Sequence, residues 1–247
     1  MEKQVKSETF LCDNMDFLRK CPDKKYDVGI VDPEYLNQSE NKEFKAGGRM
    51  VKAVGFGDFS GKPTEEYFYH LFRCTKHQII FGGNYFTDIM DYSSYIDSNN
   101  PRDVKPYLSS NNNWFVWYKQ FADAKWSMAE LAWVSFDKSI RVHREFPMNN
   151  VADWHPTSKP VGVYKYLIET YLKKGMSILD TNLGSGSIRR AAYSLGHPFT
   201  GLEISEKFYN LEKRDFEEYI KSYNLFINNS ESNLDSANTF NFNIDEL

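Results

Sequence analysis

The stretch Tyr26-Asp-Val-Gly-Ile-Val-Asp32-Pro33-Glu34-Tyr35 decides the fold. Its first six residues form an apolar, β-branched run that is typical of a strand covered on both faces. Pro33 removes a backbone donor, so the strand must end before it. A carboxylate, a rigid backbone and an aromatic ring therefore follow the carboxyl end of a buried strand, which is the edge where open α/β sheets bind ligands. These four residues alone are equally compatible with an active site and with an ordinary strand-to-loop turn.

Composition indicates a globular protein with room for one large domain or two small ones. Hydrophobic residues make up 41% of the 247 residues. No apolar run reaches the roughly 18 residues of a membrane span, and the first residues lack the apolar core of a signal peptide. Cys12, Cys21 and Cys74 lack metal-ligand spacing. They favour reduced thiols and hence a cytoplasmic location.

Charge is unevenly distributed. The net charge is −4, and from Leu225 onward there are four acids and no Lys or Arg. Setting these four aside leaves 30 acids against 30 bases. A neutral body can still carry a basic cleft, so the net charge does not exclude a nucleic-acid partner. We expect one domain over residues 1–227 and a disordered acidic tail over residues 228–247, which are rich in Asn and Ser.

Strands and helices alternate along the rest of the chain, which predicts a doubly wound α/β sheet. The long segments 36–63 and 92–113 interrupt this alternation as loop insertions, the first of them either substrate-facing or a solvated insertion. The expected strands cover residues 9–12, 26–31, 77–84, 114–118, 131–136, 176–179 and 198–202, and the expected helices cover residues 14–20, 64–76, 161–174, 188–195 and 205–223.

The segment from Asp180 to Glu203 predicts a nucleotide-binding half of such a sheet. A strand, a turn containing Gly184 and Gly186, a helix and a second strand ending in an acid follow one another. Glycines let the backbone approach a ligand closely, and the acid can accept hydrogen bonds from ribose hydroxyls. The glycine spacing is not that of a dinucleotide site, and no Gly-Lys-Ser/Thr is present for a triphosphate. A helix start packed tightly on a strand remains the alternative.

Five motifs together resemble the amino-group DNA methyltransferases of the permuted β group. The order of the motifs, with the catalytic tetrapeptide first and the cofactor loop last, is that of the β group, and the resemblance covers roughly residues 9–220. Asp32-Pro33-Glu34-Tyr35 resembles Asp-Pro-Pro-Tyr, His155-Pro-Thr-Ser-Lys159-Pro160 is similar to His-Pro-Thr-x-Lys-Pro, Asp180-Thr-Asn-Leu-Gly-Ser-Gly186 is similar to Asp-Pro-Phe-x-Gly-Ser-Gly, and Phe81-Gly-Gly-Asn84 and Ala129-Glu-Leu-Ala-Trp133 are further matches.

This resemblance implies the seven-stranded methyltransferase sheet in circularly permuted order and S-adenosylmethionine as the cofactor. The implied partner is double-stranded DNA, as in restriction–modification, bound by a monomer or a homodimer. The target would be the exocyclic amino group of an extruded base, because a base inside the duplex cannot reach such a pocket. An aspartate in the first position of the tetrapeptide, here Asp32, favours adenine N6 over cytosine N4.

The resemblance also implies roles for individual residues. Asp32 and the Pro33 carbonyl would each accept an N–H of the target amine, which aims the nitrogen at the methyl group, and Tyr35 would stack on the base. No metal is required, and the five histidines show no ligand-like grouping. The implied cofactor contacts are Asp180, Gly184 and Gly186 in the loop, Glu203 on the ribose, Asp13 on the adenine ring, and Thr157, Ser158 and Lys159 near the methionine moiety.

Two departures from the family pattern keep other functions open. Glu34 replaces the second proline of the tetrapeptide, and Thr181-Asn182 replaces Pro-Phe in the cofactor loop. A methyltransferase acting on RNA or on a protein amide, and a catalytically inactive DNA-binding or cofactor-sensing module, are the alternatives. Recognition would rest on short loops, which predicts a short recognition sequence or help from a dimer partner. The basic and aromatic candidates in these loops are Arg49, Lys52, Arg102, Lys105 and Trp126.

Overall fold

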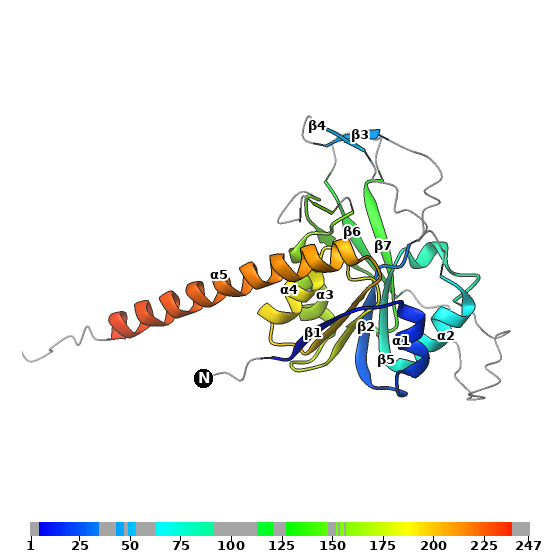
Figure 1. Ribbon diagram of the computed structural model, residues 1–247, viewed down its shortest axis with the longest axis horizontal. Coiled ribbons are helices and arrows are strands. Elements are labelled where there is room, and N and C mark those ends of the chain that lie inside the picture. The colour runs from blue at the N-terminus through cyan, green and yellow to red at the C-terminus, as the bar shows by residue number, and fades with distance from the viewer. Residues whose placement is uncertain are drawn as a thin grey trace, which may run out of the picture.

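The computed structural model describes residues 5–34, 43–46, 49–52, 63–90, 113–120, 127–147, 152, 154–155 and 157–238, with only the backbone described for 43–46, 49–52 and 226–238. A mixed eight-stranded sheet, in the order β1-β10-β9-β2-β5-β7-β6-β8, forms its centre (Figure 1). The strands are β1 (Ser7–Leu11), β2 (Tyr26–Val31), β5 (Thr75–Phe81), β6 (Trp114–Tyr118), β7 (Ala129–Val134), β8 (Arg141–Arg144), β9 (Ile178–Asp180) and β10 (Phe199–Glu203).

Five neighbouring strands of this sheet, from β1 to β5, are parallel. Strand β7 is antiparallel to both of its neighbours, β5 and β6. Helices connect the parallel strands, as such connections require. They are α1 (Asn14–Lys20), α2 (Glu65–Cys74), α3 (Val161–Tyr171), α4 (Ser187–Ser194) and α5 (Glu206–Asn238), with a short 3₁₀ turn η2 (Gly83–Tyr85) after β5.

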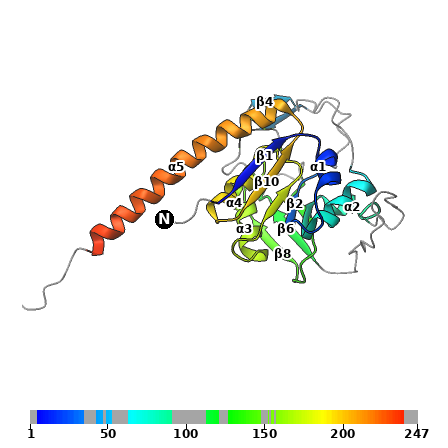
Figure 2. The same cartoon turned by 60° about the horizontal axis from the view of Figure 1, so that its bottom comes forward.

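Each face of the sheet carries its own hydrophobic core. On one face, Leu18 of α1 and Phe68 of α2 pack with Val31 and Leu179. On the other face, α3 and α4 pack against the sheet through residues such as Leu167. Figure 2 shows α1 and α2 on one side of the strands and α3, α4 and α5 on the other. The predicted doubly wound α/β class is therefore confirmed.

Four local differences separate the structure from the sequence expectation. The sheet has an eighth strand, β8, beside β6. Two short strands, β3 (Glu43–Ala46) and β4 (Arg49–Lys52), pair as an antiparallel hairpin inside the expected loop 36–63. Helix α2 ends at Cys74, where Thr75 takes an extended conformation and starts β5. Other expected loop residues, including 92–112, lie outside the described residues.

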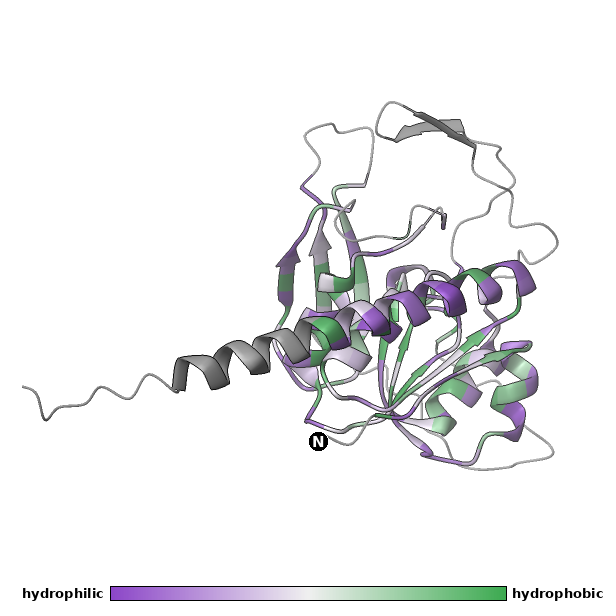
Figure 3. Cartoon of the chain, turned by 60° about the vertical axis from the view of Figure 1, so that its left-hand side comes forward, coloured by the Kyte–Doolittle hydropathy of each residue, from purple (hydrophilic) through white to green (hydrophobic). Residues whose placement is uncertain are grey.

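The fourth difference concerns the C-terminal helix. The helix expected to end near Tyr223 runs to Asn238, so residues 228–238 of the expected disordered tail are helical. The far half of α5 extends away from the sheet (Figure 1). The near half of α5 is amphipathic and packs on the domain through the buried Phe216. Figure 3 shows mostly hydrophobic strands, whereas α5 presents hydrophilic residues outward. No helix in the described ranges is long and apolar enough to cross a membrane.

Candidate active site

The site lies where the direction of the winding reverses. Strands β9 and β2 are hydrogen-bonded neighbours, with Val28 beside Ile178 and Gly29 beside Leu179. From β9 the chain continues toward β10 on one side, and from β2 it continues toward β5 on the other. Ligands of open α/β sheets bind in the crevice that such a switch leaves at the carboxyl ends of the strands. Asp180 ends β9 and Asp32 follows β2, so both acids reach this edge.

The Asp32 carboxylate is held on one side only. The ammonium of Lys159 donates to its Oδ2 atom. The Oδ1 atom is buried and accepts no hydrogen bond from the described residues. Burial raises the pKa of Asp32, and this effect exceeds the opposing influence of the nearby Lys159 charge. A carboxylate oxygen without a donor at the crevice is available to accept an N–H from a ligand.

Lys159 is buried between two acids. Its side chain is 6% exposed, and its ammonium lies 3.2 Å from Glu130 Oε2 in addition to its contact with Asp32. Glu130 also binds Lys119, at 2.5 Å. Burial opposes the ionisation of Glu130, but the two lysines outweigh it and lower its pKa. The Lys159 ammonium further lies 4.8 Å from the centre of the Phe81 ring, within cation–π range.

The loop after β9 has the backbone expected of a close ligand contact. Gly184 and Gly186 adopt left-handed φ angles of +51° and +68°, which favour glycine. The Gly184 amide donates to Glu203 Oε2 at 2.9 Å, and the Ser205 amide donates to Glu203 Oε1 at the same distance. Burial raises the pKa of Glu203. The acid at the end of β10 is thus fixed beside the glycine loop.

Asp180 starts the same loop. Its Oδ1 atom accepts the Asn182 amide at 3.0 Å, and the side chain is otherwise buried. Burial raises the pKa of Asp180 to about 8, and the neighbouring Asp32 and Glu203 carboxylates add to the shift. Strongly shifted acids that converge on a crevice are typical of functional sites.

The replacement of Pro-Phe by Thr181-Asn182 is accommodated by hydrogen bonds. The Tyr67 hydroxyl on α2 lies 2.6 Å from Thr181 Oγ1. Thr181 Oγ1 also donates to Asn182 Oδ1 at 2.7 Å. Both Tyr67 and Thr181 are buried. The polar side chains at these two positions therefore fix the first turn of the loop, which a proline would stiffen by its ring.

The segment before α3 packs directly on the glycine loop. Ser158 Oγ donates to Ser185 Oγ at 2.9 Å. The half-buried His155 ring lies against Gly184, where a β-carbon on the glycine would stand 3.0 Å from His155 Nε2. Burial lowers the pKa of His155 to about 4, so the imidazole is neutral at pH 7. Thr157 is exposed between them.

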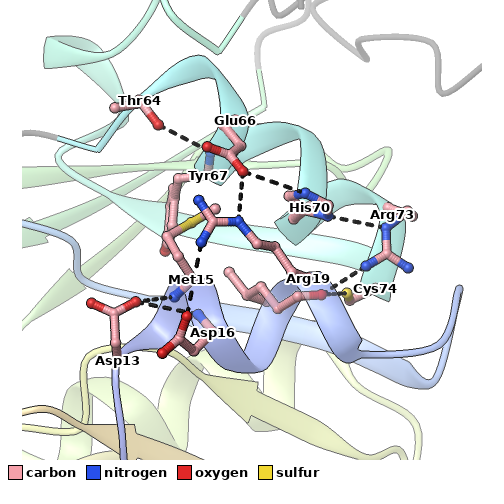
Figure 4. Close-up of polar contacts among 11 residues, drawn as sticks. Asp13, Met15, Asp16, Arg19, Thr64, Glu66, Tyr67, His70, Arg73 and Cys74 are labelled. Carbon is pink, nitrogen blue, oxygen red and sulfur yellow. Dashed lines mark hydrogen bonds and ion pairs between the residues drawn. The ribbon is translucent and has the colours of Figure 1, made fainter. Parts of the chain in front are cut away.

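Asp13 caps helix α1. Its Oδ1 accepts the Met15 amide at 2.7 Å and the Asp16 amide at 3.3 Å, and the side chain is exposed (Figure 4). Asn14 Nδ2 donates to the Thr181 carbonyl at 3.4 Å, which places the start of α1 beside the cofactor loop. The structure therefore brings Asp13 to the same edge as the loop, although its carboxylate already has a structural task.

Helix α1 is tied to α2 by an ionic network. Arg19 Nε donates to Glu66 Oε1 at 2.8 Å. Arg73 donates to the Leu18 carbonyl at 2.7 Å and to His70 Nδ1 at 3.2 Å. Figure 4 shows these side chains filling the space between the two helices. The network fixes α2, and with it Tyr67, relative to the loop.

Of the predicted site residues, the structure brings the acids, glycines and Ser158–Lys159 to one edge. Pro33 is buried directly after Asp32. Tyr35 lies outside the described residues, so its predicted role is untested. Sequence reasoning assigned no role to Glu130, Lys119 or Tyr67. Glu130 lies inside the quoted Ala129–Trp133 motif, and that motif was the one signal available for it.

The donor set is consistent with a nucleoside-containing cofactor. Gly184 and Gly186, which have left-handed φ angles, carry no side chain that would keep a ligand from the backbone. The buried Glu203 carboxylate retains lone pairs for ribose hydroxyls after accepting its two amides. Within the described ranges, no three His, Cys, Asp or Glu side chains gather as a metal site. The fold and the site together define a Rossmann-like domain with a nucleoside-binding crevice.

Comparison with known proteins identifies the family. The profile of the N6/N4 methyltransferase family, described as DNA methylase, matches residues 59–214. This chain belongs to that family, and S-adenosylmethionine is accordingly its methyl donor.

Individual relatives agree with this assignment. Type II methyltransferase M2.MboI of Moraxella bovis is 22% identical over 236 residues, which cover 83% of this chain and 85% of the relative. The M1.HpyAVI–SAM complex is similar in fold, with a TM-score of 0.52 and 14% identity over 84% of this chain and 98% of that one. PvuII DNA methyltransferase, described as cytosine-N4-specific, has a TM-score of 0.57 and 9% identity, covering 91% of this chain and 94% of that one.

Proposed function

We propose that this protein transfers a methyl group from S-adenosylmethionine to the exocyclic amino group of adenine in double-stranded DNA. The observation that carries the proposal is the buried Oδ1 atom of Asp32, which accepts no hydrogen bond from any residue that the structure describes. An N–H of the target amine is a suitable donor for this atom. The aspartate in the first position of the tetrapeptide supports adenine over cytosine.

The amine needs help because its lone pair is delocalised into the base ring. Accepting one N–H at Asp32 and a second at the Pro33 carbonyl favours a pyramidal nitrogen whose lone pair is directed at the methyl group. The cofactor supplies an electrophilic methyl on sulfur. When the N–C bond forms, the S–C electron pair would remain on sulfur as a neutral thioether, and the proton that the nitrogen sheds would pass to water. Correct placement of the two reactants supplies most of such an acceleration.

Other residues hold the reactants. Glu203 and the loop at Gly184 and Gly186 bind the nucleoside part of the cofactor, Asp180 lies at the loop start, and Asp13 is proposed to lie against the adenine ring. Thr157, Ser158 and Lys159 are proposed to approach the methionine part. Tyr35 is proposed to stack on the extruded base, since aromatic stacking stabilises a base taken out of the duplex.

The proposed surroundings are a reducing cytoplasm and a DNA partner. Cys12, Cys21 and Cys74 are all free thiols in the structure, which supports a reducing compartment. The chain is proposed to act as a monomer or a homodimer. The recognition contacts are proposed to come from the loops 36–63 and 92–113.

The decisive experiment offers labelled S-adenosylmethionine with DNA, RNA and protein in parallel. DNA from the reaction is digested and its nucleosides are separated by mass. We expect N6-methyladenine with the native protein and at least a hundredfold less with Asp32→Ala. N4-methylcytosine would replace the adenine assignment, label only in RNA or protein would remove DNA as the substrate, and equal activity of both proteins would remove the catalytic role of Asp32.

A protein that binds the cofactor but transfers no methyl group would be a sensing module. Calorimetry of cofactor binding therefore accompanies the activity assay. Sequencing of DNA from cells that express the protein, by a method that detects modified bases, gives the recognition sequence in the same step.

A further inference from the structure

The ammonium of Lys159 already has partners that a cofactor-binding lysine does not need. The resemblance places this lysine near the cofactor's carboxylate, yet in the structure it bridges the carboxylates of Asp32 and Glu130. It is almost wholly buried, and the Phe81 ring covers it. A buried ammonium is stable only when such partners replace its water.

The bridge is part of a row of alternating charges that three elements assemble. Lys119 follows β6, Glu130 lies on β7, and Lys159 precedes α3. The row reads Lys119, Glu130, Lys159, Asp32, and it ends at the reacting edge of the sheet. Because the members are largely buried, each charge acts on the next more strongly than it would in water.

We propose that Lys159 is a positioning residue that fixes Oδ2 of Asp32 so that Oδ1 faces the target amine, and that Glu130 sets how tightly Lys159 holds it. The inference rests on the proposed function for the identity of the amine. It gives Glu130 a role that the resemblance does not assign, and for Lys159 it replaces the contact with the methionine part by a contact with Asp32. Neither Lys159 nor Glu130 touches the reacting atoms in this arrangement.

Removing the charge of Lys159 and removing the charge of Glu130 are expected to shift the pKa of Asp32 in opposite directions. Removal of the Lys159 charge takes away the cation that favours ionised Asp32, so the pKa of Asp32 rises. Removal of the Glu130 charge takes away an anion that disfavours ionised Asp32 and also frees Lys159, so the pKa falls. A general loss of packing would not produce opposite signs. The other titratable groups that face Asp32 are Lys119, Asp180, Tyr67 and Tyr164, and these are left unchanged.

The first measurement does not depend on activity. The carboxyl ¹³C signal of Asp32, assigned by its loss in Asp32→Asn, is titrated in the native protein, Lys159→Met, Lys159→Arg and Glu130→Gln. We expect the pKa of Asp32 to rise by about one unit or more in Lys159→Met, since one close opposite charge is worth roughly one to three units. We expect a fall in Glu130→Gln, and a value near the native one in Lys159→Arg.

A control Lys–Asp pair lies at the other end of strand β2. Lys76 of β5 binds Asp27 of β2 at 2.7 Å, away from the edge of the sheet that holds Asp32. Lys76→Met should leave the pKa of Asp32 and the rate of methyl transfer unchanged. A shift in this variant would mean that the signals report general destabilisation, and the inference would then be withdrawn.

The second measurement separates positioning from cofactor binding. If Lys159 positions Asp32, Lys159→Met lowers kcat roughly ten- to a hundredfold and leaves the cofactor Kd within threefold, because misplacement of a reacting group is costly. If instead Lys159 holds the cofactor's carboxylate, Kd rises at least tenfold, kcat at saturation is retained, and the inference is overturned. Should Lys159→Met not fold, an unchanged Asp32 pKa in Glu130→Gln overturns it equally.

The outcomes also distinguish this inference from the proposed function. If the native protein methylates no DNA but the two variants shift the pKa of Asp32 in opposite directions, the inference stands and the proposed DNA substrate is wrong. If the native protein methylates DNA but neither variant changes the pKa of Asp32, the proposed function stands and the inference about the row of charges is wrong.

Discussion

The backbone of Gly186 packs so closely on Glu212 that a β-carbon would lie 2.5 Å from Glu212 Oε1. Glu212 is on α5 and is held there by the buried Arg189, whose Nη1 donates to Glu212 Oε2 at 2.8 Å. The C-terminal helix therefore presses directly on the turn that opens α4. Gly186 belongs to the cofactor loop itself, so a displacement of Glu212 would change the conformation of that loop directly.

Gly186→Ala tests this contact. The left-handed φ of +68° costs an alanine about 1 kcal/mol, and the displacement of Glu212 adds to it. We expect a loss of unfolding free energy of about 2–3 kcal/mol and weaker cofactor binding, measured by urea denaturation and calorimetry.

Gly175→Ala is the matched control. Gly175 has a φ of +82°, and a β-carbon there would meet nothing within 4 Å. Its stability loss should equal the backbone cost alone, and its cofactor affinity should be native. Equal losses in both variants would show that the Glu212 contact has no influence on the loop.

Asp180 makes the stability of the cofactor-free protein depend on pH. Its pKa is raised from 3.8 to about 8, so the folded state binds the proton more tightly than the unfolded chain does. Protonated Asp180 therefore makes its full contribution to the free energy of unfolding below pH 4, and this contribution is lost as the pH rises to about 8. Asp180→Asn removes this dependence and can still accept the Asn182 amide.

We expect Asp180→Asn to be more stable than the native protein by a few kcal/mol at pH 9, and close to native at pH 4. Urea denaturation at four pH values between these limits gives the difference in unfolding free energy between the variant and the native protein. The effects of the other titrating groups are common to both proteins and cancel in this difference. A difference that is constant with pH would mean that Asp180 does not carry the shift.

Tyr67 supports the loop where the family has proline and phenylalanine. Tyr67→Phe removes the 2.6 Å contact with Thr181, and we expect a loss of about 1 kcal/mol of unfolding free energy with a raised KM for the cofactor. The double variant with Thr181→Val should show a coupling energy of about 0.5–2 kcal/mol. Additive effects would show that the two hydroxyls do not act together.

Glu34 stands in the tetrapeptide where the family has proline. Its Oε1 atom is buried, it finds no donor among the described residues, and burial raises its pKa. Glu34→Pro removes this atom and restricts the unfolded chain, so we expect a gain of about 0.5–1 kcal/mol in stability and a turnover at least as high as native.

Glu34→Gln separates the charge from the stiffness of the backbone, because it keeps the shape without the ionisable group. A tenfold fall of kcat in both variants would show that the Glu34 carboxyl itself takes part in the reaction. A fall in Glu34→Pro alone would show that the loop needs freedom at this position.

The sequence was sufficient for the elements whose pattern is local. The bounds of β2, α1 and β6 agree with the expected ones, because the apolar runs, the Asp13 cap and Pro33 all act within a few residues. Strand β8 gave no such signal, since Arg141-Val-His-Arg144 is largely exposed and is a strand only through its pairing with β6.

The site was predicted in part for the same reason. Asp32, Asp180 and Glu203 each end a buried strand, and this position can be recognised from neighbouring residues. The Glu130–Lys159 contact joins segments that are far apart in the sequence, and only the sheet order brings them together. The hydrogen bond that holds Thr181 likewise comes from α2, so no local pattern announces it.

The neighbouring strands β2 and β9 have a consequence for the chain as a whole. Asp32, the acid proposed to receive the amine, follows one of the first strands, and the glycine loop proposed to bind the methyl donor follows one of the last, so most of the groups proposed for the two substrates lie in opposite halves of the polypeptide. A chain divided between β5 and β6 would separate donor binding from acceptor binding into two fragments. Methyl transfer would then occur only when the two fragments associate, so the activity could be used to detect their association.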